Sequence, residues 1–189
     1  MFYKEQGFEF DIKKLNLELG NFLYERVKNY LKEKQIRNDI IESASHNFSI
    51  DELLKVYKKT YVLNKSINKD FGKDVVAIYK RSVSILLSEN KNLSNFNGNV
   101  DPGLFKNDYE KNLYKKIHEI KKYYSSVGRD ENFEESLKIL SFCKSEVYDF
   151  FENVIVNDND ETIKKNRLGL LSMLCKSFDN YFNFSKIEG

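Results

Sequence analysis

The sequence predicts an all-α protein, folded as an antiparallel bundle of about five to seven helices. Apolar residues recur at intervals of three and four through most of the chain, which is the spacing of a helix face and not the alternation of a strand. The 189 residues include one proline and eight scattered glycines, so few breaks separate the apolar runs. We therefore interpret residues 1–189 as a single helical domain with a core of its own.

The first helix is expected to run from Ile12 to Lys34. Its apolar residues form one stripe, which we expect to face the core: Leu15, Leu19, Phe22, Leu23, Val27, Tyr30 and Leu31. A short helix should follow from Ile36 to Ala44. After it, Ser49 and Glu52 have the spacing of a capping box, flanked by a possible hydrophobic staple, so a third helix should begin at about Ile50.

The middle of the chain contains two further helices and one irregular connection. The helix that begins near Ile50 carries Leu53, Leu54, Tyr57, Tyr61 and Leu63, and the next helix is expected from Asp70 to Ser88. The stretch from Glu89 to Phe105 is rich in Asn and Ser and holds the only proline, so it reads as a loop within the domain.

The C-terminal third should form three more helical segments. Asn107 and Glu110 repeat the capping-box spacing, and Gly128 should end the helix that follows. A long helix is expected from Phe133 to Val154. The polar turn at residues 157–160 then separates it from a last helix, expected from Asp160 to Phe182, with Asp160 and Glu161 in the first turn, where carboxylates favour the exposed amides.

Charge is balanced over the whole chain, at +2, but it is unevenly distributed. Between Lys55 and Arg81 there are eight basic residues and two acidic ones, an excess of six. Between Ser145 and Ile163 there are six acidic residues and no basic one. Such runs are either two solvated helix faces, or surfaces that attract phosphates and cations respectively.

Catalytic chemistry finds little support in the sequence. The glycine-rich phosphate motifs and the H-E-x-x-H zinc motif are absent, so we expect no catalytic residue and no metal site. His46 and His118 are the two histidines, and both are expected at the surface. Cys143 and Cys175 lie within apolar runs and are expected to be buried thiols of a reducing compartment.

With no apolar run of about 18 residues and no signal-peptide pattern at the N-terminus, we expect a cytoplasmic protein that does not contact membranes.

Residue types suited to binding are better represented in the sequence than catalytic ones. Tyr57, Tyr61 and Tyr79 alternate with the lysines of the basic stretch, and such pairs bind RNA loops through phosphate contacts and base stacking. The alternative is that these tyrosines form the half-buried rim of the bundle, with only their hydroxyl groups in water.

Four blocks of sequence, in order, carry a resemblance that spans nearly the whole chain. They are Arg37-Asn38-Asp39-Ile40-Ile41; Tyr79-Lys80-Arg81 with Ile85-Leu86; Val100-Asp101-Pro102-Gly103-Leu104-Phe105; and Phe150-Phe151-Glu152-Asn153-Val154-Ile155-Val156 followed by Asp160-Glu161 and Asn166-Arg167-Leu168-Gly169-Leu170-Leu171. In these blocks the chain resembles the C-terminal end of bacterial glycyl-tRNA synthetase beta subunits. The whole beta subunit is several times longer, so the resemblance implies an excised domain.

The resemblance implies a DALR-type anticodon-binding domain that recognises the anticodon stem-loop of glycine tRNA. Aminoacylation, with its ATP and magnesium, would then take place in the catalytic alpha subunit, and this chain alone would have no activity and no cofactor. The implied partners are glycine tRNA, the alpha subunit and the remaining domains of the beta subunit, in an alpha2beta2-type assembly. Glycine anticodons end in two cytosines, whose edges are read by Arg, Asn or Lys and by carboxylates or backbone carbonyls.

Carried over block by block, the resemblance implies RNA contacts for Arg37, Asp39, Lys80, Arg81, Asn166 and Arg167. Tyr57, Lys58 and Lys59 of the basic stretch complete the set of candidates. Each has a structural alternative: Arg37 and Asp39 can pair at a helix junction, and Asn166 and Arg167 can tie the last helix to its neighbours. Lys58 and Lys59 stand where the family tends to have Arg, and lysine lacks the bidentate fork of that side chain.

A second reading comes from a different functional class. The acidic face between Ser145 and Ile163, with its aromatic pair Phe150 and Phe151, also suits a helical protein-interaction module. Such a module would dock another synthetase subunit or domain without touching RNA.

Overall fold

The chain forms an all-α structure, described here from a computed structural model that defines residues 11–46, 52–126, 132–179 and 181–188. Regular structure in these ranges consists of α-helices and short 3-10 helices, and they contain no strand, so the predicted fold class is confirmed. The elements are α2 (Ile12–Glu33), α3 (Asn38–Ala44), α4 (Leu53–Ser66), α5 (Asp70–Glu89), α6 (Asp108–Ser126), α7 (Phe133–Ser141), α8 (Lys144–Asn153) and α9 (Glu161–Asp179), with the 3-10 helices η2 (Leu93–Asn95), η3 (Pro102–Leu104) and η4 (Phe184–Lys186).

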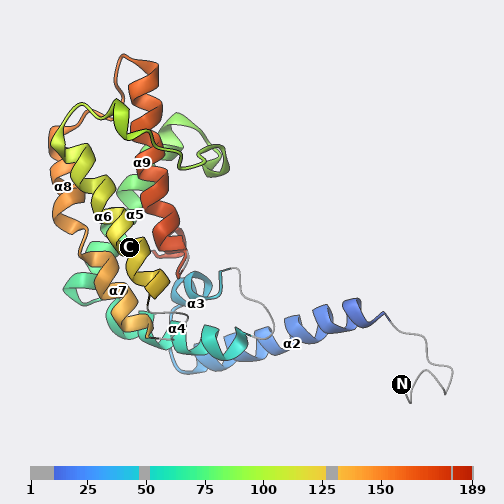
Figure 1. Ribbon diagram of the computed structural model, residues 1–189. Coiled ribbons are helices and arrows are strands. Elements are labelled where there is room, and N and C mark those ends of the chain that lie inside the picture. The colour runs from blue at the N-terminus through green and yellow to red at the C-terminus, as the bar shows by residue number, and fades with distance from the viewer. Residues whose placement is uncertain (1–10, 47–51, 127–131, 180, 189) are drawn as a thin grey trace, which may run out of the picture.

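Helices α5 and α9 form the centre of the body (Figure 1). Helix α5 packs against α9, α7 and α8, while α6 packs against α8 and α9. At one end of the body, α3 packs against α4 and against η4, which follows α9 near the C-terminus. Segments from the two ends of the chain therefore meet at the α3 end of the bundle.

The core is organised around α9, which is buried on nearly all sides. Every residue from Asn166 to Cys175 is buried, and the largest fully buried side chains include Phe150, Phe178 and Phe184. A helix in the interior of a bundle needs apolar residues around its whole circumference and not along one stripe. This explains why the apolar run that begins at Leu168 is almost continuous.

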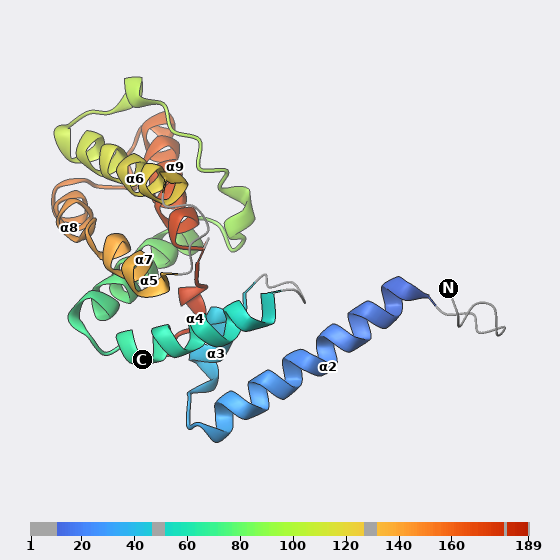
Figure 2. The same ribbon diagram turned by 60° about the horizontal axis from the view of Figure 1, so that its bottom comes forward.

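The irregular segment between α5 and α6 crosses α9 and is held against it (Figures 1 and 2). The hydroxyl group of Ser172 donates to the carbonyl oxygen of Phe96 at 3.0 Å, and Nζ of Lys176 donates to that of Asn97 at 2.7 Å. Further along the segment, the chain approaches Gly169 so closely that a Cβ there would lie 2.3 Å from the carbonyl oxygen of Asn99. The predicted loop is therefore confirmed, and it is closely packed against the central helix.

The prediction of one long helix over residues 133–154 is wrong, because α7 and α8 are separate helices. The N–H of Phe142 donates to the carbonyl of Ile139 at 3.1 Å, and the thiol of Cys143 donates to that of Leu140 at 3.0 Å. These contacts tighten the chain into a turn without a proline or glycine to mark it. The turn allows α7 to pack against α4 and α5 while α8 packs against α6.

Three other predicted boundaries differ from the structure or lie outside its described residues. Helix α9 ends at Asp179 and not at Phe182, because the chain turns there and then enters η4. The expected helix start near Ile50, its cap at Ser49 and the stop at Gly128 lie outside the described residues.

Helix α2 projects from the body along much of its length, and most of its predicted core stripe is exposed (Figures 1 and 2). Near its C-terminal end Leu31 is buried, Val27 is half-buried, and the hydroxyl groups of Tyr24 and Ser45 lie 2.8 Å apart. The body does not reach the earlier turns, so the inward orientation predicted for the stripe is wrong there. The exposed apolar residues of α2 include Leu15 (50%), Leu19 (47%), Phe22 (55%), Leu23 (37%) and Tyr30 (46%).

We expect Gly169→Ala to lower the free energy of unfolding by about 1–3 kcal/mol, because the added methyl group would displace the backbone at Asn99. Urea unfolding followed by circular dichroism would measure the change. Lys165→Ala, at an exposed position one turn earlier in α9, is the control and should alter stability by less than about 0.5 kcal/mol. Equal stabilities of the two variants would contradict the close approach.

Candidate nucleic-acid interface

Arg167 is buried in the centre of an ion-pair network, with its side chain 6% exposed. Its Nε donates to Oε1 of Glu110 at 2.7 Å, and its Nη1 donates to Asp158 at 2.6 Å and to the carbonyl of Ile155 at 2.8 Å. The carboxylate of Glu110, 1% exposed, also closes the predicted capping box at the start of α6, where it accepts from the N–H of Asn107. The network therefore gives Arg167 a structural role. It ties α9 to its neighbours, which is the role that the sequence allowed as an alternative to RNA contact.

Asn166 joins two of the sequence blocks that are far apart in the chain. Its Oδ1 accepts from the N–H of Asp101 at 2.7 Å, and its Nδ2 donates to the carbonyl of Asp101 at 3.0 Å. Both functions of the amide are therefore used on the backbone just before η3, and the residue is 6% exposed. This pairing positions the loop that crosses α9.

Arg37 and Asp39 pair at the start of α3. This is the pairing at a helix junction that the sequence allowed as an alternative to RNA contact. Nε of Arg37 donates to Oδ1 of Asp39 at 3.0 Å, and the guanidinium also donates to the carbonyl of Glu188 at 2.8 Å. Burial alone would raise the pKa of Asp39, but the N–H of Glu188, the Arg37 guanidinium and the N–H of Ile40 outweigh it and hold that pKa below its ordinary value. The pair thus binds the C-terminal segment to α3, while half of the Arg37 side chain stays exposed.

The candidates on α5 do not share one surface. Tyr79 is 3% exposed, and its hydroxyl group donates to Asp179 at 2.6 Å, so its ring belongs to the core and not to an RNA-stacking surface. Burial and this hydrogen bond raise the pKa of Tyr79. Lys80 is half-buried. Arg81 is exposed and lies over the ring of Phe151 on α8, 4.2 Å from the ring centre.

Tyrosines and lysines do gather where α2 meets α4. The rings of Tyr57 and Tyr61, one helical turn apart on α4, are stacked with centres 5.9 Å apart, and Tyr30 of α2 continues the row at 6.2 Å. Nζ of Lys65 lies 4.8 Å from the centre of the Tyr61 ring, and Nζ of Lys34 lies 5.3 Å from that of Tyr30. Cations therefore flank a row of aromatic rings.

Lys58 lies on the same side of α4 as Tyr57 and Tyr61, since the three residues follow helical spacing, and it is exposed. We call this surface the tyrosine–lysine face and define it by Tyr30, Lys34, Tyr57, Lys58, Tyr61 and Lys65. Lys59 points differently: its ammonium group lies over the rings of Phe133 and Phe182, and burial lowers its pKa. Spacing within α4 could group Tyr57, Lys58, Tyr61 and Lys65, but no sequence signal brings Tyr30 and Lys34 to them from another helix.

The acidic stretch is only partly available at the surface. Glu146 pairs with Lys116 of α6 at 3.5 Å, and Asp158 is bound by Arg167. Phe150 is fully buried, and Phe151 lies beneath Arg81. The aromatic pair therefore serves the packing of α8 more than a docking surface.

The described residues contain no cluster of histidine, cysteine, aspartate and glutamate able to hold a metal ion. His118 is exposed with its ring against Tyr114, and burial raises the pKa of the Cys143 thiol to about 12. Within the same residues, none of the helices has the length and apolar character needed to span a membrane. The tyrosine–lysine face instead presents cations beside aromatic rings, an arrangement suited to binding a ligand.

Comparison with known proteins gives a family match and several relatives. The family model described as the DALR anticodon binding domain matches residues 75–188. Proteins named glycine–tRNA ligase beta subunit are similar over most of the chain. The one from Rickettsia felis is 32% identical over 170 residues, which is 89% of this chain and 24% of the relative, and the one from Sulfurihydrogenibium sp. is 29% identical over 187 residues, which is 98% of this chain and 27% of the relative.

The beta subunit of Rickettsia canadensis is 32% identical over 168 residues. This chain spans about a quarter of the length of these curated relatives. The family model begins within α5, so the tyrosine–lysine face lies outside the family match but inside the region that the relatives share.

We expect Arg167→Met to lower the free energy of unfolding by about 3–5 kcal/mol, because Glu110 would stay buried without its partner. The double variant with Glu110→Gln should recover part of this loss, since glutamine can still cap α6. Denaturant unfolding of all four members of the cycle would measure the coupling. As the control, Arg81→Met removes an exposed guanidinium and should cost less than about 1 kcal/mol.

A change of less than about 1 kcal/mol for Arg167→Met would show that the buried pair contributes little.

Proposed function

Because this chain belongs to the DALR anticodon-binding domain family, we propose that it binds the anticodon arm of a transfer RNA, specifically glycine tRNA. The family match carries this proposal, since it covers α6 to α9 and most of α5. The names of the relatives support the choice of glycine tRNA. Binding at the anticodon arm would position the RNA for aminoacylation elsewhere, and a wrong anticodon base would leave polar groups unpaired.

The tyrosine–lysine face is the surface that we propose for RNA contact. Base–aromatic stacking contributes about 1–3 kcal/mol for each base, and it tolerates any base because every base has a π face. Lysines beside the rings would contact phosphates and release counterions, so the affinity should depend steeply on salt. Tyr61 and Lys65, both exposed on α4, are the first residues to test.

The other predicted site residues divide into two groups. Arg37 and Arg81 have largely exposed side chains, although their guanidinium groups also contact Asp39 and Phe151, and they are proposed as secondary phosphate contacts, as is the half-buried Lys80. Asp39, Lys59, Asn166 and Arg167 use their polar groups within the protein, and we propose that they act on RNA binding only by fixing the fold.

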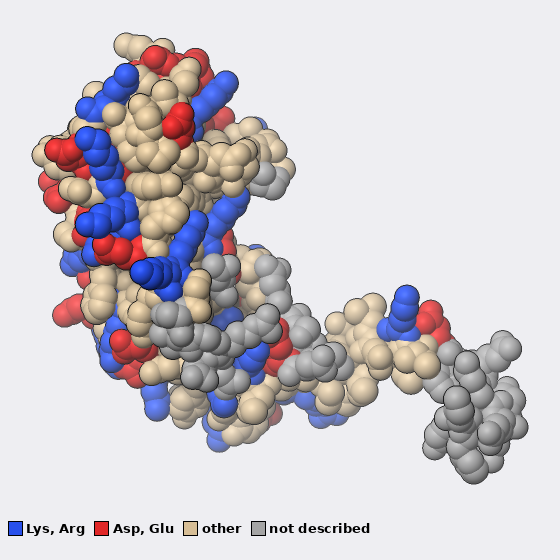
Figure 3. All heavy atoms as spheres, in the orientation of Figure 1, with Lys and Arg blue, Asp and Glu red and all other residues tan. Residues whose placement is uncertain are grey.

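Catalysis is proposed to occur elsewhere, on an alpha-type catalytic subunit that binds ATP and magnesium. The relatives are about four times as long as this chain, so in them the matched region is accompanied by further polypeptide. We propose that the exposed apolar stripe of α2 docks that remaining part of a beta subunit, in an alpha2beta2-type assembly. Exposed apolar residues in one continuous stripe are typical of a protein interface, and in Figure 3 uncharged atoms lie along the visible face of α2, beside charged side chains near its N-terminal end.

Tyr61→Leu should weaken binding to glycine tRNA by about 5- to 150-fold, because leucine keeps the apolar bulk but cannot stack on a base. Lys34→Ala and Lys65→Ala should each reduce the slope of log affinity against log salt by about one. Fluorescence anisotropy at two salt concentrations would measure both effects. Tyr148→Leu, on α8 and of similar exposure to Tyr61, is the control and should bind as the unchanged chain does.

The same titration with a tRNA whose two anticodon cytosines are replaced tests anticodon reading. Weaker binding of the altered tRNA is the expected result. Equal binding of the two tRNAs would contradict anticodon recognition, and no binding near physiological salt would contradict the proposed function itself.

Leu19→Asp should weaken association with the remaining part of the Rickettsia felis beta subunit by more than about tenfold, because it places a charge in the centre of the apolar stripe. Leu17→Asp is the matched control, since Leu17 is 66% exposed but lies about 160° around the helix from the stripe. Analytical ultracentrifugation of the mixed polypeptides would measure both. Equal effects of the two substitutions, or no association of the unchanged chain, would exclude docking through the stripe.

A further inference from the structure

A groove of about 640 Å³ lies between the segment that follows α5 and the N-terminal half of α9. Phe96, Val100 and Leu168 contribute apolar walls, and Gly169 forms part of the floor. The groove is also lined by polar side chains, namely Asn95, Asn97, Asn99, Asp101, Thr162, Lys165 and Asn166. Its volume lies within the range of small-molecule binding sites, so it has room for a nucleobase.

The backbone on one side of the groove is held in place at several points. The carbonyl of Phe96 accepts from Ser172, and both backbone groups of Asp101 bond to Asn166. Gly98 has a φ of +75°, a conformation that side-chain-bearing residues rarely adopt, which lets the chain turn between these points. The groove is thus preformed in this structure and does not depend on a ligand for its shape.

Side chains alternate along this segment. Asn95, Asn97 and Asn99 are exposed, whereas Phe96 and Val100 are half-buried against the body. Asn95 ends the 3-10 helix η2 and Gly98 has a positive φ, so the segment is not a regular strand. Its three exposed carboxamides nevertheless all line the groove.

Of these three asparagines, Asn99 is the one whose carboxamide we expect to hydrogen-bond to a ligand. Asn95 donates from Nδ2 to Asn90, and Oδ1 of Asn97 accepts from the N–H of Asn99. In the hydrogen bonds found among the described residues, Asn99 takes part through its backbone N–H and not through its carboxamide. Asn99 and Lys165, which is exposed on α9, both line the groove.

We propose that this groove binds one unpaired base of an RNA loop, with the carboxamide of Asn99 on the polar edge of the base. A carboxamide both donates and accepts, which matches the adjacent donor and acceptor of a Watson–Crick edge. Single-stranded loops present their bases in this way, with an aromatic or apolar surface against the ring. Phe96 and Val100 supply that surface, and Lys165 supplies a positive charge for the neighbouring phosphate.

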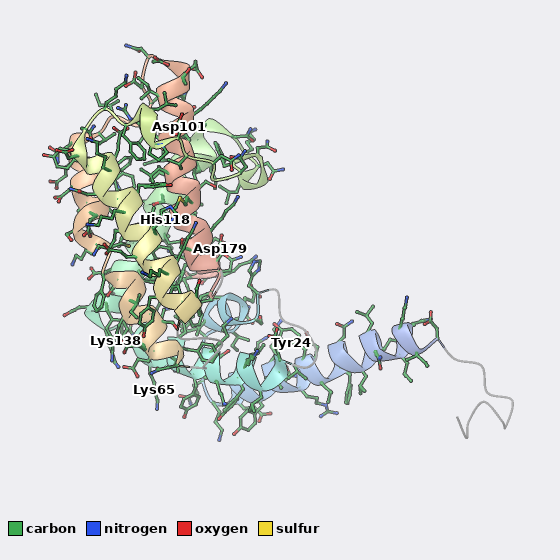
Figure 4. The ribbon with its side chains drawn as sticks, in the orientation of Figure 1. Tyr24, Lys65, Asp101, His118, Lys138 and Asp179 are labelled. Carbon is green, nitrogen blue, oxygen red and sulfur yellow. The ribbon has the colours of Figure 1, made fainter. Side chains whose placement is uncertain are left out.

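The inference rests on the proposed function for the identity of the ligand, but it concerns a separate surface. Asp101, at the groove, and Lys65, on the tyrosine–lysine face, lie near opposite ends of the body (Figure 4). The anticodon arm would have to reach both surfaces, or the two would act on different parts of the RNA. Substitutions in one place should therefore leave the other intact.

The first test is a titration of the full chain, labelled with 15N, with cytidine 5′-monophosphate. The side-chain amide signals of Asn95, Asn97 and Asn99 should shift in NMR spectra, whereas that of Asn112, exposed on α6, should not. In Asn99→Ala the remaining shifts should require a several-fold higher nucleotide concentration. The backbone carbonyl of Asn99 that contacts α9 is retained in this variant, and its thermal unfolding would verify that the fold is unchanged.

The second test uses tRNA. Asn99→Ala should weaken binding of glycine tRNA by about three- to tenfold, as expected for the loss of one hydrogen bond to a base, and Asn112→Ala should not. If the unchanged chain binds tRNA while Asn99→Ala has no effect and the mononucleotide shifts none of the three amides, the groove proposal is overturned and the proposed function stands. If the mononucleotide shifts the amides but tRNA does not bind, the groove is supported and the proposed function fails.

Discussion

The buried ion pair between Arg167 and Glu110 is the interaction on which most of the bundle depends. Glu110 caps the start of α6, and Arg167 occupies the middle of α9 while also holding the turn between α8 and α9 through Ile155 and Asp158. Two charges taken out of water are costly unless both are paired and hydrogen-bonded, and here they are. A shift of α6 or α9 by one residue would leave them unpaired, so the pair fixes how these helices are placed against each other.

Residues that carry the resemblance to known proteins are mostly used inside the molecule. Asn166 binds the backbone of Asp101, Tyr79 binds Asp179, and Asp39 binds the N–H of Glu188. Each contact joins segments distant in the sequence and so positions a loop or a terminus. Motif residues of this kind specify the frame of the domain. The tyrosine–lysine face that we propose for RNA lies mostly outside these motifs, whereas the groove beside α9 is lined partly by motif residues such as Val100 and Leu168.

Two regions of the surface contrast in chemistry. The tyrosine–lysine face and the groove beside α9 offer aromatic rings, amides and cations, which are suited to an RNA loop. The first turns of α2 offer leucine and phenylalanine, which are suited to another protein surface. Tyr30 belongs to the same helix as that apolar stripe but contacts Tyr57 of α4, so α2 connects the two regions. A partner that docked on α2 would consequently lie next to the tyrosine–lysine face that we propose for RNA.

The sequence by itself determined the helical class, most helix positions and the cap at Asn107, because these depend on spacing and on hydrogen bonds between neighbours in the chain. It also placed Tyr57 and Lys58 together on α4. Only the tertiary structure decided which polar candidates stay available: Arg167, Asn166 and Asp39 bond to residues more than 50 positions away, and no local pattern contains such partners. The exposure of α2 was decided in the same way, because an apolar stripe is identical in sequence whether or not another surface covers it.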